Sequence, residues 1–299
     1  MRVFVTGASG WIGSATVDDL LAAGHEVIGL ARSDNSAATL AAKGVTVLRG
    51  DLDDLDSLRR GATDADAVVH LANKHDWNDH EATTRAERTA VQTLADALAG
   101  TGKPFAIASG LALIADGRTA LETDLSPAVG PDSMRGGSEN LALSYVERGV
   151  RTIILRFAPT VHGIGDHGFV AFIAAAARRH GDSGYVGDGS TAWPAVHVSD
   201  AARLIRLSIE KAPAGSILHA VAEEGVPTKE IAEGIGAALD VPVSSITADE
   251  AVERIGSFVG GFFGVNLRAS STRTRELLDW TPFGPTLLDD IKAGGYPGV

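Results

Sequence analysis

The 299-residue sequence contains no cysteine, which excludes disulfide bonds, thiolate nucleophiles and cysteine-ligated zinc. Basic residues are in the minority, with 26 Lys and Arg against 38 Asp and Glu, and the net charge of −12 disfavours a nucleic-acid surface. No apolar run reaches the roughly 18 residues that a membrane span requires. Met1 leads almost directly into an apolar strand, without a charged leader segment. We therefore expect a cytoplasmic protein with neither a nucleic-acid nor a membrane partner.

The nine histidines show no HExxH or comparable metal-binding pattern. His75 and His80 lie five residues apart with acidic residues nearby, but they make a poor set of ligands. We expect no metal site.

Apolar segments of strand length alternate with helical segments through the first half of the chain. The expected strands are residues 1–6, 26–31, 45–49, 67–72, 105–109 and 151–157. The expected helices are residues 11–23, 34–42, 55–60, 80–99 and 135–147. Helices that connect successive strands favour a parallel sheet covered on both faces, so we expect an α/β fold with a Rossmann-type doubly wound sheet.

The alternation becomes irregular after residue 157, where we expect one strand at 217–221 and several helices. Those helices are residues 169–179, 199–211, 228–239, 248–255 and 272–278. We predict a dinucleotide-binding domain over 1–158, to which 195–221 returns, and a smaller C-terminal substrate-binding lobe. The lobe comprises residues 159–194 and 222–299.

Residues 3–13 read VFVTGASGWIG and place glycines at 7, 10 and 13 between a strand and a helix. Such glycines let the chain turn sharply and approach a pyrophosphate, which the N–H groups and the positive dipole end of the helix then bind. A simple turn is the alternative, but the strand–loop–helix context favours dinucleotide binding. The expected loop contacts are Thr6, Gly7, Ser9, Gly10, Trp11, Ile12 and Gly13.

The second expected strand ends in GLARSDN, where an NAD site usually places an acidic residue that binds the ribose. A guanidinium at Arg32 would bind a 2′-phosphate, and the hydroxyl of Ser33 could donate to it. We therefore prefer NADP(H), with NAD(H) as the alternative. In that alternative Arg32 is a solvated surface residue and Asp34 contacts the ribose.

The segment TGASGWIG resembles the TGxxGxxG motif of the short-chain dehydrogenase/reductase superfamily, and the chain length resembles its extended epimerase/dehydratase branch. Further resemblances in the same order are GDLDD at 50–54, HLAN at 70–73, LRFAPTVHG at 155–163, WPAVHVSDAARL at 193–204 and ELLDWTP at 276–282. The resemblance covers nearly the whole chain. It implies that the dinucleotide also contacts Asp51, Leu52, Leu71, Ala72, Asn73, Pro159 and Val161.

Catalysis in this superfamily rests on a Ser or Thr and a Tyr-x-x-x-Lys unit, and Ser109 matches the serine. The three tyrosines are Tyr145, Tyr185 and Tyr296, and none has a lysine four residues on. The resemblance therefore implies a superfamily member without the usual proton donor.

The flanking motifs set the register of the missing pair. Glu139 lies 17 residues before Arg156, as in similar proteins, which places Arg135 at the lysine position and Pro131 at the tyrosine position. The alternative register places Met134 and Ser138 there and also lacks the pair. Arg135 could hold the ribose, but it cannot serve as a general acid near neutral pH because its proton is held too tightly.

His162 in the VHG turn is the candidate replacement, because histidine titrates in the useful range and the resemblance places this turn beside the nicotinamide. The alternative is a glycine-rich linker in which Asp166 and His167 support the following helix. We expect His197 to be structural, at the entry to a helix capped by Asp200 or Ser199. The residues that could line the substrate are His75, Trp77, Tyr185 and Trp193, with exposed-loop or core roles as the alternatives.

These features favour an NADP(H)-dependent oxidoreductase acting on a small carbonyl, alcohol or activated alkene. Ser109 would polarise the substrate oxygen, Arg135 would anchor the ribose, and His162 or a water would supply the proton. The alternative is a catalytically inactive NADP-sensing protein, and a nucleotide-sugar epimerase or dehydratase ranks third. A homodimer is compatible with the resemblance.

Overall fold

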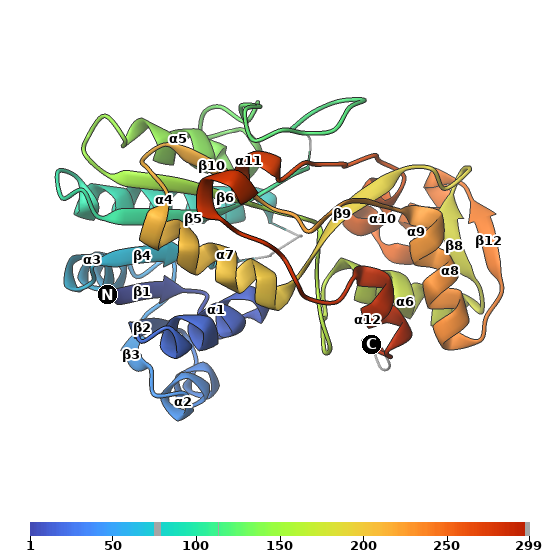
Figure 1. Cartoon of the computed structure of the whole chain (residues 1–299), viewed down its shortest axis with the longest axis horizontal. Coiled ribbons are helices and arrows are strands. Elements are labelled where there is room, and N and C mark those ends of the chain that lie inside the picture. The colour runs from blue at the N-terminus through green and yellow to red at the C-terminus, as the bar shows by residue number, and fades with distance from the viewer. Residues whose placement is uncertain (75–78, 113, 297–299) are drawn as a thin grey trace.

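A computed structural model describes residues 1–74, 79–112 and 114–296. Seven parallel strands form the central sheet in the order β10-β6-β5-β4-β1-β2-β3 (Figure 1). Their bounds are β1 Arg2–Thr6, β2 Glu26–Ala31, β3 Thr46–Arg49, β4 Ala67–His70, β5 Pro104–Gly110, β6 Arg151–Phe157 and β10 Ser216–Ala220. The strand order reverses beside β1, which is the topological switch point where ligands of such sheets bind. The predicted α/β fold with a doubly wound parallel sheet is confirmed.

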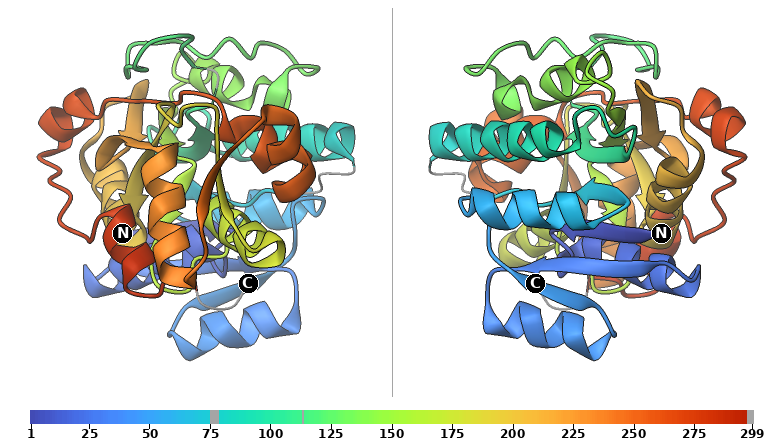
Figure 2. Two further views of the ribbon diagram at one scale, coloured as in Figure 1. Left: turned by 90° about the vertical axis from the view of Figure 1, so that its right-hand side faces the viewer. Right: turned by 90° about the vertical axis from the view of Figure 1, so that its left-hand side faces the viewer.

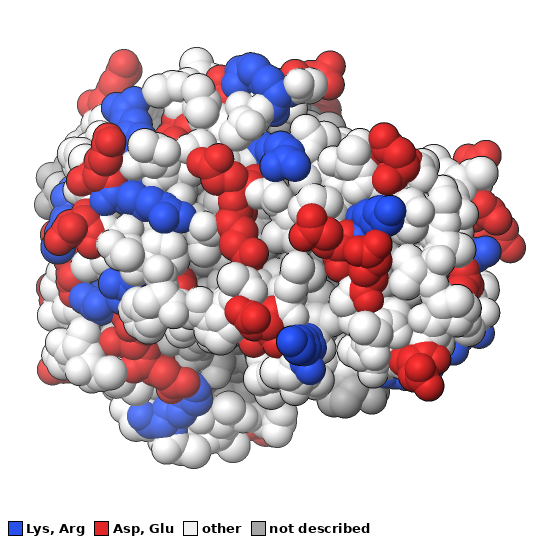
Figure 3. Space-filling view, turned by 45° about the vertical axis from the view of Figure 1, so that its right-hand side comes forward, with Lys and Arg blue, Asp and Glu red and all other residues white. Residues whose placement is uncertain are grey.

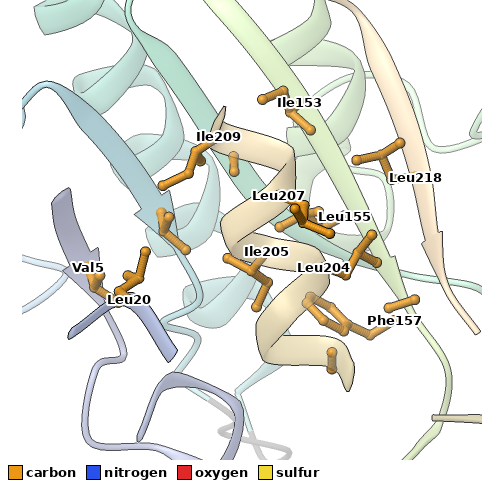
Figure 4. Packing of buried hydrophobic residues seen from close by; sticks show 14 of the residues in the cluster. Val5, Leu20, Ile153, Leu155, Phe157, Leu204, Ile205, Leu207, Ile209 and Leu218 are labelled. Atoms are coloured by element: carbon orange, nitrogen blue, oxygen red, sulfur yellow. The ribbon is translucent and has the colours of Figure 1, made fainter. Parts of the chain in front are cut away.

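Helices cover both faces of this sheet. One face is covered by α1 Trp11–Ala22, α2 Asp34–Ala42, α7 Val198–Lys211 and α11 Thr272–Leu278, and the other by α3 Leu55–Asp64, α4 His80–Leu98 and α5 Ser138–Ser144. Successive side chains of a strand point to opposite faces, so Val3 and Val5 pack with Leu20 of α1 whereas Phe4 packs toward α3. Figure 4 shows the aliphatic side chains of α7 lying against those of β6 and β10.

The C-terminal lobe contains two small sheets and its own apolar core. Its strands are β7 Thr160–His162, β8 Ser183–Val186, β9 Ala192–His197, β11 Glu223–Pro227 and β12 Val243–Ile246. Its helices are α6 Phe169–His180, α8 Thr228–Leu239, α9 Ala248–Ile255, α10 Ser257–Phe263 and α12 Leu287–Lys292 (Figures 1 and 2). None of these five short strands was predicted, because three to six residues carry too little periodicity to be recognised.

The helix predicted over 135–147 is shorter than expected, and this prediction was wrong at its start. The α-helix α5 begins only at Ser138, after the 3₁₀ turn η1 Met134–Gly137. Arg135, Gly136 and Gly137 have φ values of 54°, 64° and 59°. Two consecutive glycines make this left-handed turn accessible, since glycine has no Cβ to clash, and Arg135 adopts it at a cost in strain.

The described residues contain no helix that is long and apolar enough to cross a membrane. They also contain no group of three or more His, Asp or Glu side chains placed to hold a metal ion. On the face shown in Figure 3, basic side chains are dispersed among acidic ones and form no continuous basic surface.

Candidate dinucleotide and active site

The glycine loop between β1 and α1 is packed too tightly for side chains at two of its positions. A Cβ on Gly13 would lie 1.9 Å from the Gly7 carbonyl oxygen, and one on Gly7 would lie 2.8 Å from the backbone nitrogen of Ala72. Gly7 also has a φ of 69°, in the left-handed region that favours glycine. The N-cap of α1, Gly10, provides no side-chain cap, so the first N–H groups of the helix are available to an anion. The loop thus fits the pyrophosphate of a dinucleotide.

Hydrogen bonds that involve β1, β7 and the turn after β4 hold this loop in place. Thr6 Oγ1 accepts the N–H of Ala72 at 3.2 Å and lies 2.8 Å from His70 Nδ1. The indole N–H of Trp11 donates to the carbonyl oxygen of Val161 at 2.7 Å. The predicted loop contacts and Val161 therefore lie together at the carboxyl edge of the sheet, while Ser9 and Gly10 are exposed.

A second basic residue, which was not predicted, lies beside the end of β2. Arg49 at the end of β3 pairs with Asp34 at 3.0 Å and donates to the Ser33 carbonyl oxygen at 2.9 Å. The strands β2 and β3 are in register here, with Ala31 opposite Arg49, so two arginines flank the predicted ribose position. The hydroxyl of Ser33 caps α2 by accepting the N–H of Ser36. The Asp34 carboxylate and the Ser33 hydroxyl thus both have partners within the protein, and the side chain of Arg32 is exposed.

The turns after β3 and β4 are held by their own side chains. Asp51 accepts the N–H groups of Asp53 and Asp54 at 2.8 and 3.0 Å, and Leu52 is buried. Lys74 pairs with Asp53 at 2.7 Å, which joins the two turns. His75 and Trp77, predicted to line the substrate, lie outside the described residues.

Ser109 lies near the carboxyl end of β5 and donates its hydroxyl hydrogen to Glu139 Oε2 at 2.7 Å. Glu139 also pairs with Arg156 at 2.5 Å, and Arg156 is fully buried in β6. Arg156 lies 3.4 Å from His219 Nε2, which extends the network into β10. A serine hydroxyl has only one hydrogen, and here that hydrogen is donated to Glu139. In this arrangement Ser109 can accept a hydrogen bond from a substrate hydroxyl, but it has no hydrogen left to donate to a substrate oxygen.

Arg135 is held by a residue that the sequence did not single out. Its Nη2 donates to Glu87 Oε1 at 2.6 Å, and the second oxygen of Glu87 accepts from Asn73 Nδ2 at 3.0 Å. Glu87 lies on α4 and is 1% exposed. Burial lowers the pKa of nearby His70, although Glu87 opposes this effect. A charged residue in a polar helical segment usually lies on the surface, so nothing in the sequence marked Glu87 as buried.

His162 is fully buried, and its Nδ1 lies 2.6 Å from Asp290 Oδ2 of α12. A carboxylate only accepts, so Nδ1 carries the proton of this bond. Burial lowers the pKa of His162, with the hydrogen bond to Asp290 acting in the opposite direction. On the same loop, Asp166 accepts from the Tyr296 hydroxyl at 2.9 Å, and the ring of His167 lies edge-on to Trp11 with centroids 5.9 Å apart. The C-terminal segment thus holds the loop that contacts Trp11.

The remaining candidate residues lie in the C-terminal lobe or at its border. Trp193 is fully buried, packs edge-on against Phe169 and Phe263, and donates to the Phe262 carbonyl oxygen at 3.3 Å. Tyr185 lies half-buried beneath Lys229, whose ammonium is 5.6 Å from the ring centroid. Pro159 is half-buried, two residues after the end of β6. His197 is itself the N-cap of α7, accepting the N–H of Ser199. The Asp200 carboxylate instead accepts the N–H of Gly284 at 2.8 Å.

A seven-stranded parallel sheet with a glycine loop at its switch point defines a Rossmann-type nucleotide-binding protein. Comparison with known proteins gives the family. The model of the NAD-dependent epimerase/dehydratase family matches residues 3–220, and the chain belongs to this family. The resemblance seen in the sequence motifs is confirmed.

Three similar proteins illustrate the range of this relationship. An uncharacterized protein of Schizosaccharomyces pombe is 43% identical over 99% of this chain and 100% of its own length. The 4-hydroxy-2-methyl-3-oxo-4-farnesyl-3,4-dihydroquinoline-1-oxide ketoreductase of Stigmatella aurantiaca is 27% identical over 73% of this chain and 67% of its own. The solved UDP-glucose 4-epimerase of Thermus thermophilus in complex with NAD has a TM-score of 0.76 at 22% identity, covering 100% of this chain and 99% of its own. That structure shares the fold.

Proposed function

We propose that this protein is an NADP(H)-dependent oxidoreductase acting on a small carbonyl, alcohol or activated alkene. The observation that carries the proposal is the glycine loop, in which the backbone of Gly13 packs against Gly7 and the N-terminus of α1 is open to an anion. The name of the Stigmatella relative, a ketoreductase, is consistent with carbonyl chemistry.

The preference for NADP(H) rests on charge at the ends of β2 and β3. Arg32 is exposed there, and Arg49 lies beside it. Arg49 pairs with Asp34, so this carboxylate is less able to bind ribose hydroxyls, and the guanidinium of Arg32 favours a 2′-phosphate.

A bound nicotinamide dinucleotide supplies hydride-transfer chemistry, and the protein supplies binding, orientation and exclusion of side reactions. Thr6, Gly7 and the first turn of α1 would bind the pyrophosphate, and Arg135 would bind the ribose. Ser109 would donate a hydrogen bond to the substrate oxygen only after releasing Glu139. We assign the proton to a water rather than to His162, because the His162 ring is fully buried and paired with Asp290.

A second candidate function is an NADP-sensing protein without catalysis. Each of the three residues predicted to take part in the chemistry has a polar partner within the protein: Ser109 has Glu139, Arg135 has Glu87 and His162 has Asp290. Such pairing favours a site that binds without reacting. A nucleotide-sugar epimerase or dehydratase stays third, because it depends most on the Tyr-x-x-x-Lys unit, and none of the three tyrosines has a lysine four residues on.

One experiment distinguishes these functions. Purified protein is mixed with NADPH and a panel of aldehydes, ketones and enones, and absorbance of the reduced nicotinamide is followed. Turnover that falls in Ser109→Ala supports the oxidoreductase. Tight NADPH binding without turnover on any substrate supports the sensor instead.

A further inference from the structure

The buried carboxylate of Glu87 binds the guanidinium of Arg135, and the family resemblance assigns Glu87 no role. Glu87 is 1% exposed, and both of its oxygens are used, one by Arg135 at 2.6 Å and one by Asn73 at 3.0 Å. These partners come from different parts of the chain, the turn after β4 and the turn before α5. Glu87 therefore joins two segments at the carboxyl edge of the sheet.

The backbone at Arg135 is shaped to reach this carboxylate. Arg135 and Gly136 both have positive φ, and a Cβ on Gly136 would lie 2.9 Å from the Thr84 carbonyl oxygen. Arg88 donates to the Gly136 carbonyl oxygen at 2.5 Å. Thr84, Glu87 and Arg88 have the i, i+3, i+4 spacing of one helix face, so a single face of α4 both holds the turn and binds the guanidinium.

The electrostatics keep this pair charged despite its burial. Burial alone would raise the pKa of Glu87, but the charge of Arg135 and the hydrogen bonds from Arg135 and Asn73 act in the opposite direction, and the pKa lies below its usual value. His70 Nε2 is buried with no hydrogen-bond partner among the described residues, while its Nδ1 lies 2.8 Å from Thr6. The pair thus lies next to the strand ends that hold the glycine loop.

Arg135 still has hydrogen-bond donors for a ligand. Its side chain is 34% exposed whereas that of Glu87 is 1% exposed, so one part of the guanidinium faces the carboxylate and another faces outward. A guanidinium carries five N–H donors, and Glu87 is within reach of only part of this set.

We propose that Glu87 is a positioning residue, which, together with Asn73, fixes the Arg135 guanidinium in the orientation that binds the ribose of the dinucleotide. This inference rests on the proposed function, because it assumes that a dinucleotide binds at the glycine loop. The left-handed turn at 135–137 would then serve to place Arg135 where it can bind the ligand. A buried ion pair with one partly exposed member is preorganised, so little ordering of the arginine is needed when the ligand binds.

The test is a double-mutant cycle read by the dissociation constant for NADPH, measured by titration of nicotinamide fluorescence. Glu87→Gln keeps the shape of the side chain and removes its charge, and we expect the dissociation constant to rise about ten- to a hundredfold. Arg135→Met should weaken binding to a similar extent. The double variant should be no weaker than Arg135→Met alone, because Glu87 acts through Arg135.

Matched variants separate positioning from a general structural role. Glu81→Gln removes the same charge from the same helix at a site where the carboxylate is 88% exposed and pairs with Arg85, and it should leave the dissociation constant unchanged. Arg135→Lys should retain part of the affinity only while Glu87 is present. If Glu87→Gln fails to fold, the double variant, which lacks both charges, is used in its place. Its dissociation constant for NADPH is compared with that of Arg135→Met, and it should be no weaker.

The outcomes are distinguishable from failure of the proposed function. A wild-type protein that binds neither NADPH nor NADH overturns the proposed function and this inference with it. A wild-type protein that binds NADPH tightly, with Glu87→Gln binding equally well, overturns the inference alone. Losses that add fully in the double variant would also overturn it, since Glu87 would then act independently of Arg135.

Discussion

The glycine loop and the polar side chains around it lie at the same edge of the sheet but are held in different ways. The loop is a contiguous segment shaped by backbone packing, with Gly13 against Gly7 and the open N-terminus of α1 beyond it. The residues predicted to take part in the chemistry are instead held by carboxylates far away in the chain: Ser109 by Glu139, Arg135 by Glu87 and His162 by Asp290. The shape of the loop is therefore set mainly by its own backbone, whereas the other candidate residues depend on hydrogen bonds and ion pairs with residues distant in the chain.

The largest expected effect comes from breaking the most deeply buried of these networks. Arg156→Met should lower the free energy of unfolding by about 3–5 kcal/mol, because Glu139 is left buried without its cation. Urea denaturation at neutral pH measures this loss. Arg148→Met is the control, because Arg148 is half-exposed and pairs with Asp96 at the surface, and it should cost less than about 1 kcal/mol. Equal losses in the two variants would contradict the contrast between buried and surface pairs.

Breaking the loop should mainly affect binding. Gly13→Ala places a Cβ 1.9 Å from the Gly7 carbonyl oxygen, so the loop must shift, and affinity for NADPH should fall about a hundredfold. Overpacking should cost about 1–3 kcal/mol of stability. Gly24→Ala, just beyond the other end of α1, is the control. A Cβ there meets no atom within 4 Å, but Gly24 has a φ of 81°, so this variant tests the effect of backbone strain without overpacking. Unchanged affinity in Gly13→Ala would place the dinucleotide elsewhere.

The same contrast explains what the sequence could predict. The parallel sheet and the glycine loop follow from contiguous patterns, apolar strands alternating with helices and the segment TGASGWIG, and both are present in the structure. The turn at 135–137 was not predicted: its positive φ values interrupt the helix that was expected from residue 135. Glu87 and Asp290 were not predicted as site residues, because their partners lie 48 and 128 positions away along the chain.

Replacing His162 tests whether this residue contributes to stability or donates the proton. His162→Phe removes the partner of Asp290, which is itself 3% exposed, and should cost about 2 kcal/mol of stability. The pH profile of turnover should be unchanged, because we assign the proton to water. A profile that loses its acid or base limb in this variant would make His162 the proton donor after all.

The smallest effect is expected at a surface pair. Arg118 contacts both oxygens of Asp124 at 2.7 Å, and this hydrogen bonding lowers the pKa of Asp124 to about 2. The folded-state pKa lies below the unfolded one, so the pair stabilises the protein above about pH 4 and loses that contribution as the pH falls toward 2. Asp124→Asn should cost about 1 kcal/mol at pH 7 and progressively less as the pH is lowered. A cost that does not change with pH would contradict this assignment.

The central claim, that the loop binds NADP(H) with Arg32 reading the 2′-phosphate, is tested most directly by the ratio of the dissociation constants for NADH and NADPH. The wild-type protein should bind NADPH at least about tenfold more tightly than NADH. Arg32→Ala should remove this preference by weakening NADPH binding while leaving NADH binding unchanged. Equal affinities for the two dinucleotides, unaffected by Arg32→Ala, would contradict the claim.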